Sequence, residues 1–276
     1  AAGVSYRSYG EFLLPGPEGP VTRVASLQQH HATQYPPLGD WTVQDVERAA
    51  ILIEEINRFA AEGSVPQLSI IALPNDHTVG TRPGSPTPRA MVADNDLALG
   101  RIVEAISKSS IWPESAIFVV EDDAQNGPDH IDSHRSIAII ASPYARRGYD
   151  DHTMYDTVSI LRTIELILGL PPMSQYDAAA IPMFDAFQDR ADLTPYEARP
   201  NQISLDELNT AESYGAELSM RMNWDTIDDA PEELLNEIIW RSVKGADSEM
   251  PRPHTSRAWK AFDREDAERS PDLPPF

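Results

Sequence analysis

The order of three segments near the middle of the chain constrains the fold most. "QLSIIAL" (67–73) and "SAIFVVE" (115–121) are short apolar runs typical of buried strands, and "AMVADNDLALGRIVEAISKSS" (90–110) between them carries apolar residues along one side of a helix. A strand, a helix and a second strand in this order predict a right-handed βαβ unit with parallel strands. The sequence therefore predicts an α/β fold in which both strands end at the same edge of a sheet.

The remaining pattern adds one strand and four helices. "SIAIIAS" (136–142) follows the second strand with no helical pattern between them, which favours an antiparallel return. Amphipathic spacing predicts helices over residues 43–62, 156–169, 204–222 and 230–245. We expect Thr42 and Asp156 to cap the first two of these helices, and Gly63 and Gly169 to end them. Segment 1–40 is rich in turns and is expected to form loop-rich covering structure.

Composition excludes several classes of function. The chain has 276 residues with 22 Lys and Arg against 44 Asp and Glu, a formal charge of -22. Such a surface repels the phosphate backbone of nucleic acids and anionic lipid headgroups. The sequence contains no Cys, which excludes disulfides and thiolate metal sites. No apolar run approaches the ~20 residues that a membrane helix needs.

Metal-preferring side chains follow both predicted parallel strands. "PNDHTVGTRPG" comes after the first strand, and "DDAQNGPDHIDSHR" comes after the second. Because ligand sites in open parallel sheets lie beyond the carboxyl ends of strands, we expect Asp76, His77, Asp122 and Asp123 to converge. His134 stands two residues before the antiparallel strand and should lie beside the two adjacent aspartates.

These residue types suit a divalent cation. Carboxylate oxygens and imidazole nitrogens are ligands for Zn, Mn, Mg or Ca, among which Asp and His alone do not decide. Two carboxylates pushed together at a partly buried edge repel each other, and a cation removes that penalty. The alternative is an acidic, solvated turn whose Asp residues cap local structure.

Three further residues are candidates for contact with a substrate. Thr78 and Arg82 lie in the loop "HTVGTRPGSPTPR" beside the predicted site, and His130 lies in the loop after the second strand. An Arg at this place suits bidentate contact with phosphate, although it can also anchor the loop. His130 can equally pack in the turn "PDHI".

Three blocks of the sequence resemble the phosphoesterase branch of the alkaline phosphatase superfamily, which includes acid phosphatases and phospholipases C. The blocks are "LPNDHTVGTRPGSPTPRAMVADNDLALGRIVEAIS", "AIFVVEDDAQNGPDHIDSHRSIAIIASPYARRG" and "TMYDTVSILRTIELILGLPPMSQYDAAA". The resemblance extends over most of 1–245 and is strongest to bacterial extracytoplasmic members, some of which are fused to a YncE-like β-propeller.

The resemblance implies a three-layer α/β/α sandwich with a mostly parallel sheet and one antiparallel strand. Residues 1–245 would form the C-terminal portion of such a domain, and residues 246–276 a charged, Pro-containing tail. The family's first acidic and Asn ligands and its Ser or Thr nucleophile would then come from a preceding N-terminal portion of the same protein. Ser5, Ser8 and Ser26 are unconvincing as nucleophiles, because none stands at a strand-to-helix turn.

By the same resemblance, the activity is metal-dependent hydrolysis of a phosphate ester. Asp122 and Asp123 would hold one cation, and His77 and His134, with Asp76, would hold a second or contact the phosphoryl oxygens. The expected partner is a small phosphate ester or a phospholipid headgroup, not a nucleic acid, and the expected location is extracytoplasmic in a bacterium. The alternative is a non-catalytic module that binds Ca²⁺ and a component of the cell envelope.

Overall fold

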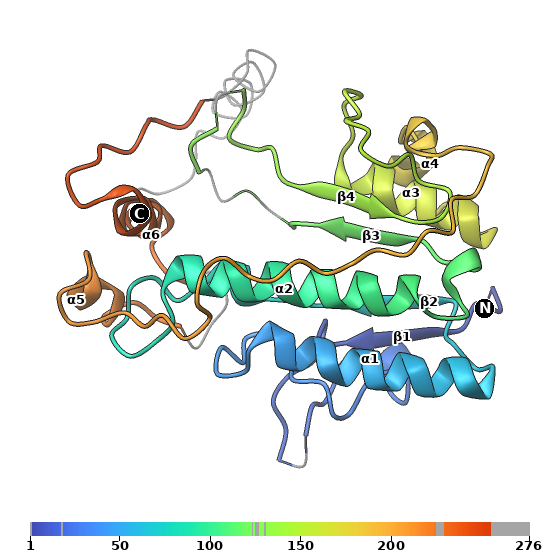
Figure 1. Ribbon diagram of the computed structural model, residues 1–276, viewed down its shortest axis with the longest axis horizontal. Coiled ribbons are helices and arrows are strands. Elements are labelled where there is room, and N and C mark those ends of the chain that lie inside the picture. The colour runs from blue at the N-terminus through green and yellow to red at the C-terminus, as the bar shows by residue number, and fades with distance from the viewer. Residues whose placement is uncertain are drawn as a thin grey trace, which may run out of the picture.

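The protein is a mixed α/β structure, which confirms the predicted class. The computed structural model describes residues 2–17, 19–122, 124, 127–129, 131–224 and 229–254. Its strands are β1 (Tyr6–Tyr9), β2 (Leu68–Ile71), β3 (Ile117–Val120) and β4 (Ala138–Ala141). Its helices are α1 (Asp45–Glu62), α2 (Pro88–Ser107), α3 (Thr157–Leu168), α4 (Gln175–Ala179), α5 (Ala216–Ser219) and α6 (Glu232–Lys244) (Figure 1).

The strands form one parallel pair and one antiparallel pair. β1 runs parallel to β2, from Tyr6 opposite Leu68 to Tyr9 opposite Ile71, and α1 makes the crossover between them. β3 pairs with β4 in antiparallel register, as the sequence predicts. β1 and β3 point to the same side of the molecule, whereas β4 points the opposite way (Figure 1). The described residues form no ladder between β2 and β3, so the parallel pair that we expected around α2 is instead built around α1.

The segment expected to be loop-rich covering structure contributes a strand and part of the core. β1 lies within residues 1–40, and Tyr9 at its end is fully buried. Tyr35 is also fully buried, packs edge-on against Tyr9, and donates a hydrogen bond of 2.7 Å to the carbonyl oxygen of Ala72. The prediction missed β1 because its sequence, "YRSY", has no apolar alternation, and pairing with β2 supplies what local propensity does not.

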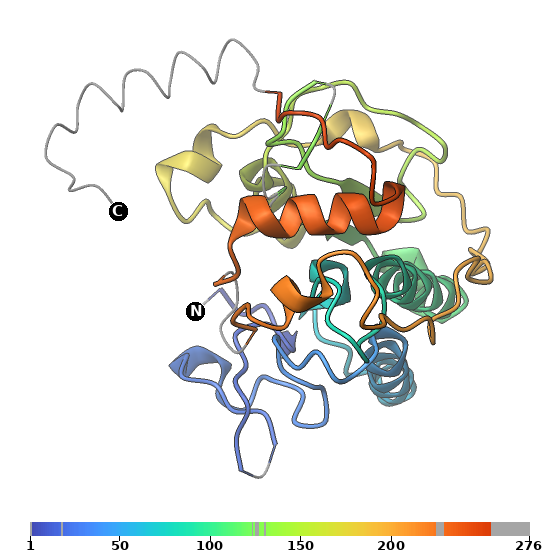
Figure 2. The ribbon, with the colours of Figure 1, turned by 90° about the vertical axis from the view of Figure 1, so that its left-hand side faces the viewer.

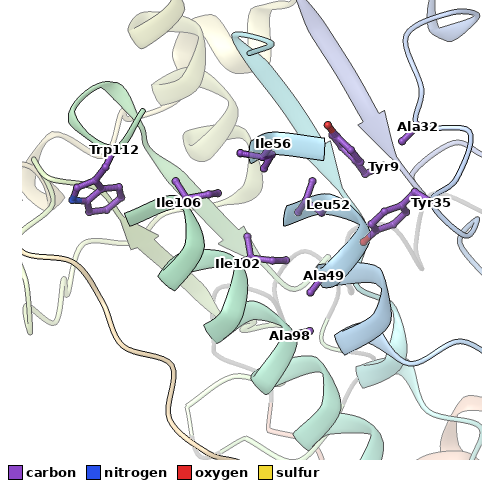
Figure 3. Close-up of a cluster of buried hydrophobic side chains, with 10 residues drawn as sticks. All are labelled: Tyr9, Ala32, Tyr35, Ala49, Leu52, Ile56, Ala98, Ile102, Ile106 and Trp112. Carbon is purple, nitrogen blue, oxygen red and sulfur yellow. The ribbon is translucent and has the colours of Figure 1, made fainter. Parts of the chain in front are cut away.

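The main hydrophobic cluster lies between α1 and α2. Figure 3 shows apolar side chains of the two helices facing each other, with two tyrosines at one end and a tryptophan at the other. The buried members of this cluster are Tyr9, Ala32, Tyr35, Ala49, Leu52, Ile56, Ala98, Ile102, Ile106 and Trp112. This core fixes α1 and α2 side by side, and thereby fixes the loops that enter and leave both helices.

Local signals correctly place several helix ends. α1 ends at Gly63, whose φ of 66° lies in the left-handed region that glycine tolerates best, and α3 likewise ends at Gly169. Asp156 caps α3 by accepting a hydrogen bond of 2.8 Å from the backbone N–H of Ser159. The predicted cap of α1 at Thr42 is wrong, because the helix begins at Asp45.

The C-terminal third differs most from the prediction. The helix expected over 204–222 is wrong: only α5 is helical there, and the residues before it form turns. The helix expected over 230–245 is confirmed as α6, which lies with α5 on one side of the molecule (Figure 2). Of the tail 246–276, residues 255–276 lie outside the described part of the chain. No helix within the described residues combines the length and the apolar character that crossing a bilayer requires.

Candidate functional site

Acidic side chains at the ends of three strands influence one another. Glu11 follows β1, Asp76 follows β2 and Asp122 follows β3. Burial raises the pKa of Glu11, and the negative charge of Asp122 raises it further. Partial burial of the carboxyl group and the same Asp122 charge raise the pKa of Asp76, although Asp76 as a residue is exposed. The charge of Asp122 therefore acts on both Glu11 and Asp76, whereas the convergence predicted for Asp76, His77, Asp122 and Asp123 stays a prediction.

A short 3₁₀ helix, η2 (Asn75–His77), carries two of the predicted site residues. The imidazole of His77 stacks on the indole of Trp41, with ring centroids 4.9 Å apart. Nδ1 of His77 lies 3.1 Å from the carbonyl oxygen of Thr78, a partner that can only accept a hydrogen bond. Nδ1 of His77 is therefore the donor in this contact, which helps to fix the orientation of the ring.

His134 has a similar orienting partner. Its Nδ1 lies 2.7 Å from Oδ1 of Asp132, and the same oxygen accepts a hydrogen bond of 3.0 Å from the backbone N–H of His134. Asp132 is 6% exposed, whereas the side chain of His134 is 40% exposed. The buried carboxylate of Asp132 therefore fixes the orientation of the more exposed His134 ring.

The loop that carries His134 returns to the end of β3. The hydroxyl of Ser136 donates a hydrogen bond of 2.8 Å to the carbonyl oxygen of Glu121, and the backbone N–H of Glu121 donates one of 3.2 Å to Ile137. These bonds extend the β3–β4 pairing to the residue before Asp122. The antiparallel return therefore places Ser136 beside the end of β3, and the position of His134 beside Asp122 stays a prediction.

The residues proposed for substrate contact occupy different environments. Thr78 is buried, and its hydroxyl accepts a hydrogen bond of 3.3 Å from the backbone N–H of Gly80, so it holds its own turn. Its φ of 63° is rare for a β-branched residue and marks a strained turn directly after His77. Arg82 is exposed. Asp123 and His130 lie outside the described residues, so their predicted roles stay predictions.

Residues 207–219, which we call the clamp, hold the loop after η2. The hydroxyl of Thr81 donates a hydrogen bond of 2.7 Å to the carbonyl oxygen of Tyr214, and its backbone N–H donates one of 3.0 Å to the hydroxyl of Ser219. The side-chain amide of Asn209 donates to the carbonyl oxygens of Gly80, Ser85 and Pro86. Figure 2 shows α5, within the clamp, beside this loop. Before α5, the clamp consists of turns and not of the expected helix, because its polar groups form hydrogen bonds to the loop after η2.

The site has donors suited to a cation, but the described residues do not form a complete coordination sphere. Within them, no three His, Asp or Glu side chains are grouped closely enough to hold a metal ion together. What the structure provides is a set of carboxylates with mutual repulsion and two imidazoles oriented through Nδ1. A cation bound near Asp122 would relieve that repulsion.

Sequence reasoning missed Glu11 and Asp132. Glu11 comes two residues after the end of the unrecognised strand β1, and recognising that strand would have predicted Glu11 at the same edge as Asp76. Asp132 stands two residues before His134, a spacing that allows a carboxylate to bind both the backbone N–H and the ring of the histidine. Neither signal is distinctive in a chain with 44 acidic residues.

The fold and the residues define a class: an α/β protein with carboxylate and imidazole side chains in the segments that follow its strands. Residues 1–171 match the Phosphoesterase family, and the chain belongs to this family. Membership implies a hydrolase that acts on phosphate esters. A search of the curated proteins found no match.

Proposed function

We propose that the protein hydrolyses phosphate esters with the help of a divalent cation bound between the segments that follow β1, β2 and β3. The observation that supports this proposal is that the negative charge of Asp122, which follows β3, raises the pKa of both Glu11, which follows β1, and Asp76, which follows β2. Repulsion of this kind favours binding of a cation and disfavours an empty site.

The residues proposed to hold the cation are Asp122 with Asp76, His77 and His134, to which the sequence adds Asp123. Bound there, the cation would neutralise negative charge on the phosphoryl group and polarise its oxygens. His77 and His134 would bind the cation or contact the phosphoryl oxygens, and the carbonyl or carboxylate oxygen at Nδ1 of each fixes the orientation of its ring. We assign no nucleophile.

The proposed substrate is a small phosphomonoester or phosphodiester, including a phospholipid headgroup. The exposed Arg82 is the proposed phosphate contact, whereas Thr78 acts through the turn that it holds. The formal charge of -22 disfavours long polyanions such as nucleic acids. The proposed frame is the three-layer sandwich of the alkaline phosphatase superfamily, and the proposed location is extracytoplasmic in a bacterium.

The test combines Mn²⁺ binding with turnover of p-nitrophenyl phosphate and bis-p-nitrophenyl phosphate. Asp122→Asn should weaken Mn²⁺ binding and lower kcat/KM by ~100-fold, the loss typical when a group that stabilises the transition state electrostatically is removed. Asp150→Asn, which makes the same change of charge at an exposed residue in the loop after β4, should alter neither. Equal Mn²⁺ affinity and turnover in wild type and Asp122→Asn would reject the assignment. Tight, stoichiometric Ca²⁺ binding without any turnover would favour the non-catalytic module.

A further inference from the structure

A buried polar network lies beneath η2. Asp45 and Arg48 on α1 are fully buried, with Arg48 Nε 3.2 Å from Oδ1 of Asp45. Asp94 on α2 is 2% exposed, and its carboxylate accepts hydrogen bonds from the backbone N–H groups of Asp45, at 2.6 Å, and Val46, at 3.1 Å. The network therefore joins the start of α1 to the middle of α2, inside the region where the two helices pack.

The same network holds the first residue of η2 at two points. The backbone N–H of Asn75 donates a hydrogen bond of 2.9 Å to Oδ2 of Asp45, and its side-chain amide donates one of 2.7 Å to Oδ2 of Asp94. Asn75 is 4% exposed, so water cannot readily replace these partners. The position of η2 is thus set by two buried carboxyl groups from two different helices.

Asn95 extends this network to the carboxylate of Asp76. The Nδ2 atom of Asn95 lies 2.7 Å from the carbonyl oxygen of Leu73, 3.1 Å from Oδ2 of Asp45 and 3.3 Å from Oδ1 of Asp76. An amide NH₂ has two hydrogens for these three acceptors, so at least two of the acceptors share one hydrogen. One side chain therefore connects the exposed Asp76 to a fully buried acid.

Asp76 needs such an anchor for two physical reasons. The charge of Asp122 repels its carboxylate, and an exposed side chain can relieve repulsion by turning toward solvent. In addition, η2 is followed by Thr78 at a φ of 63°, a backbone conformation that persists only where the surroundings hold it in place. The hydrogen bond from Asn95 to Asp76 opposes rotation of that side chain toward solvent. The hydrogen bonds from Asn75 to Asp45 and Asp94 oppose relaxation of the turn.

We propose that Asn95 is a positioning residue, which keeps the carboxylate of Asp76 and the η2 turn in place for cation binding at the strand edge. This inference rests on the proposed function, because it assigns Asn95 a role in the same site. Asn95 acts through Asp76 and through η2, and it is not itself proposed to touch the cation or the substrate. Asp45 and Asp94 support it by fixing the other side of the turn.

The test compares Asn95→Leu, a substitution of similar size without the amide, with Asn95→Gln, which keeps an NH₂ group on a longer side chain. The matched control is Asp96→Leu, at an exposed residue next to it on α2. One readout is hydrogen–deuterium exchange of residues 73–80, which requires no cation. The other is the Kd of Mn²⁺ measured by calorimetry on the whole chain.

Asn95→Leu should speed exchange in residues 73–80 and raise the Kd of Mn²⁺ by about 10-fold, the usual effect of removing a partner that orients a metal ligand. Asn95→Gln should change the exchange rate and the Kd less than Asn95→Leu does, and Asp96→Leu should change neither. Unchanged exchange, or faster exchange with an unchanged Kd, would overturn the role of Asn95. If the wild-type chain bound no Mn²⁺, the cation part of the proposed function would fail, and the exchange data would still decide whether Asn95 holds the turn.

Discussion

The carboxylate of Asp94 should contribute strongly to stability, and Asp94→Ala tests this directly. Asp94 is 2% exposed and accepts hydrogen bonds from the backbone N–H groups of Asp45 and Val46 and from the side-chain amide of Asn75. The donors on Asp45 and Asn75 are buried, and each would lose an acceptor at a cost of about 1–3 kcal/mol. Gln44, the residue before α1, makes no side-chain cap, so Asp94 performs that role from another helix. We expect the free energy of unfolding to fall by about 4 kcal/mol.

The assay is urea unfolding followed by circular dichroism, with Asp96→Ala as the control on the same helix. Asp96 is exposed, so its replacement should change the free energy of unfolding by no more than about 0.5 kcal/mol. Asp94→Asn keeps one carbonyl acceptor and should fall between wild type and Asp94→Ala. If Asp94→Ala and Asp96→Ala had equal midpoints and equal slopes, the buried carboxylate would not organise the start of α1 and the reasoning would be refuted.

Three further outcomes follow from local geometry. Asp156→Ala removes the cap of α3 and should lower the free energy of unfolding by about 1 kcal/mol in the same urea assay; no loss would show that the cap contributes nothing. Gly80→Ala should destabilise the chain by about 1 kcal/mol more than Gly84→Ala. Both glycines have positive φ, but only a Cβ at Gly80 would lie 2.7 Å from the hydroxyl of the buried Ser219, and equal losses would contradict this reason. Burial raises the pKa of Asp45 to about 7, so the folded chain holds a proton there between the unfolded pKa of about 3.9 and 7. The free energy of unfolding should therefore fall as pH rises through that window, and pH-dependent urea curves for Asp45→Asn should lack this contribution; parallel curves would contradict it.

Local sequence signals predict the parts of the fold that depend on neighbouring residues. Asp156 and Gly169 bound α3 as expected, because a cap and a left-handed terminus involve only residues within one helical turn. The spacing of apolar residues also places α2 and α6 to within a few residues. The same reasoning fails for β1 and for residues 204–222, where strand pairing and hydrogen bonds to a distant loop determine the conformation.

The candidate site is predictable to a similar degree. The order of strands predicts that Asp76, His77, Asp122 and His134 lie near one edge, and the structure adds that the charge of Asp122 raises the pKa of Asp76. Glu11 could not be found, because its strand has no apolar alternation. Nor could the sequence show that Asn95 contacts three acceptors from separate elements.

By itself, the sequence determined the α/β class, the ends of the well-capped helices and the gathering of acids and histidines after strands. Propensity, capping and charge act over a few residues, so they can be read along the chain. Only the tertiary structure decided that β1 pairs with β2, that residues 207–219 clamp a loop, and that Asn95 links Asp76 to a buried network. Those outcomes depend on contacts between residues far apart in the chain, where packing and desolvation outweigh local preference.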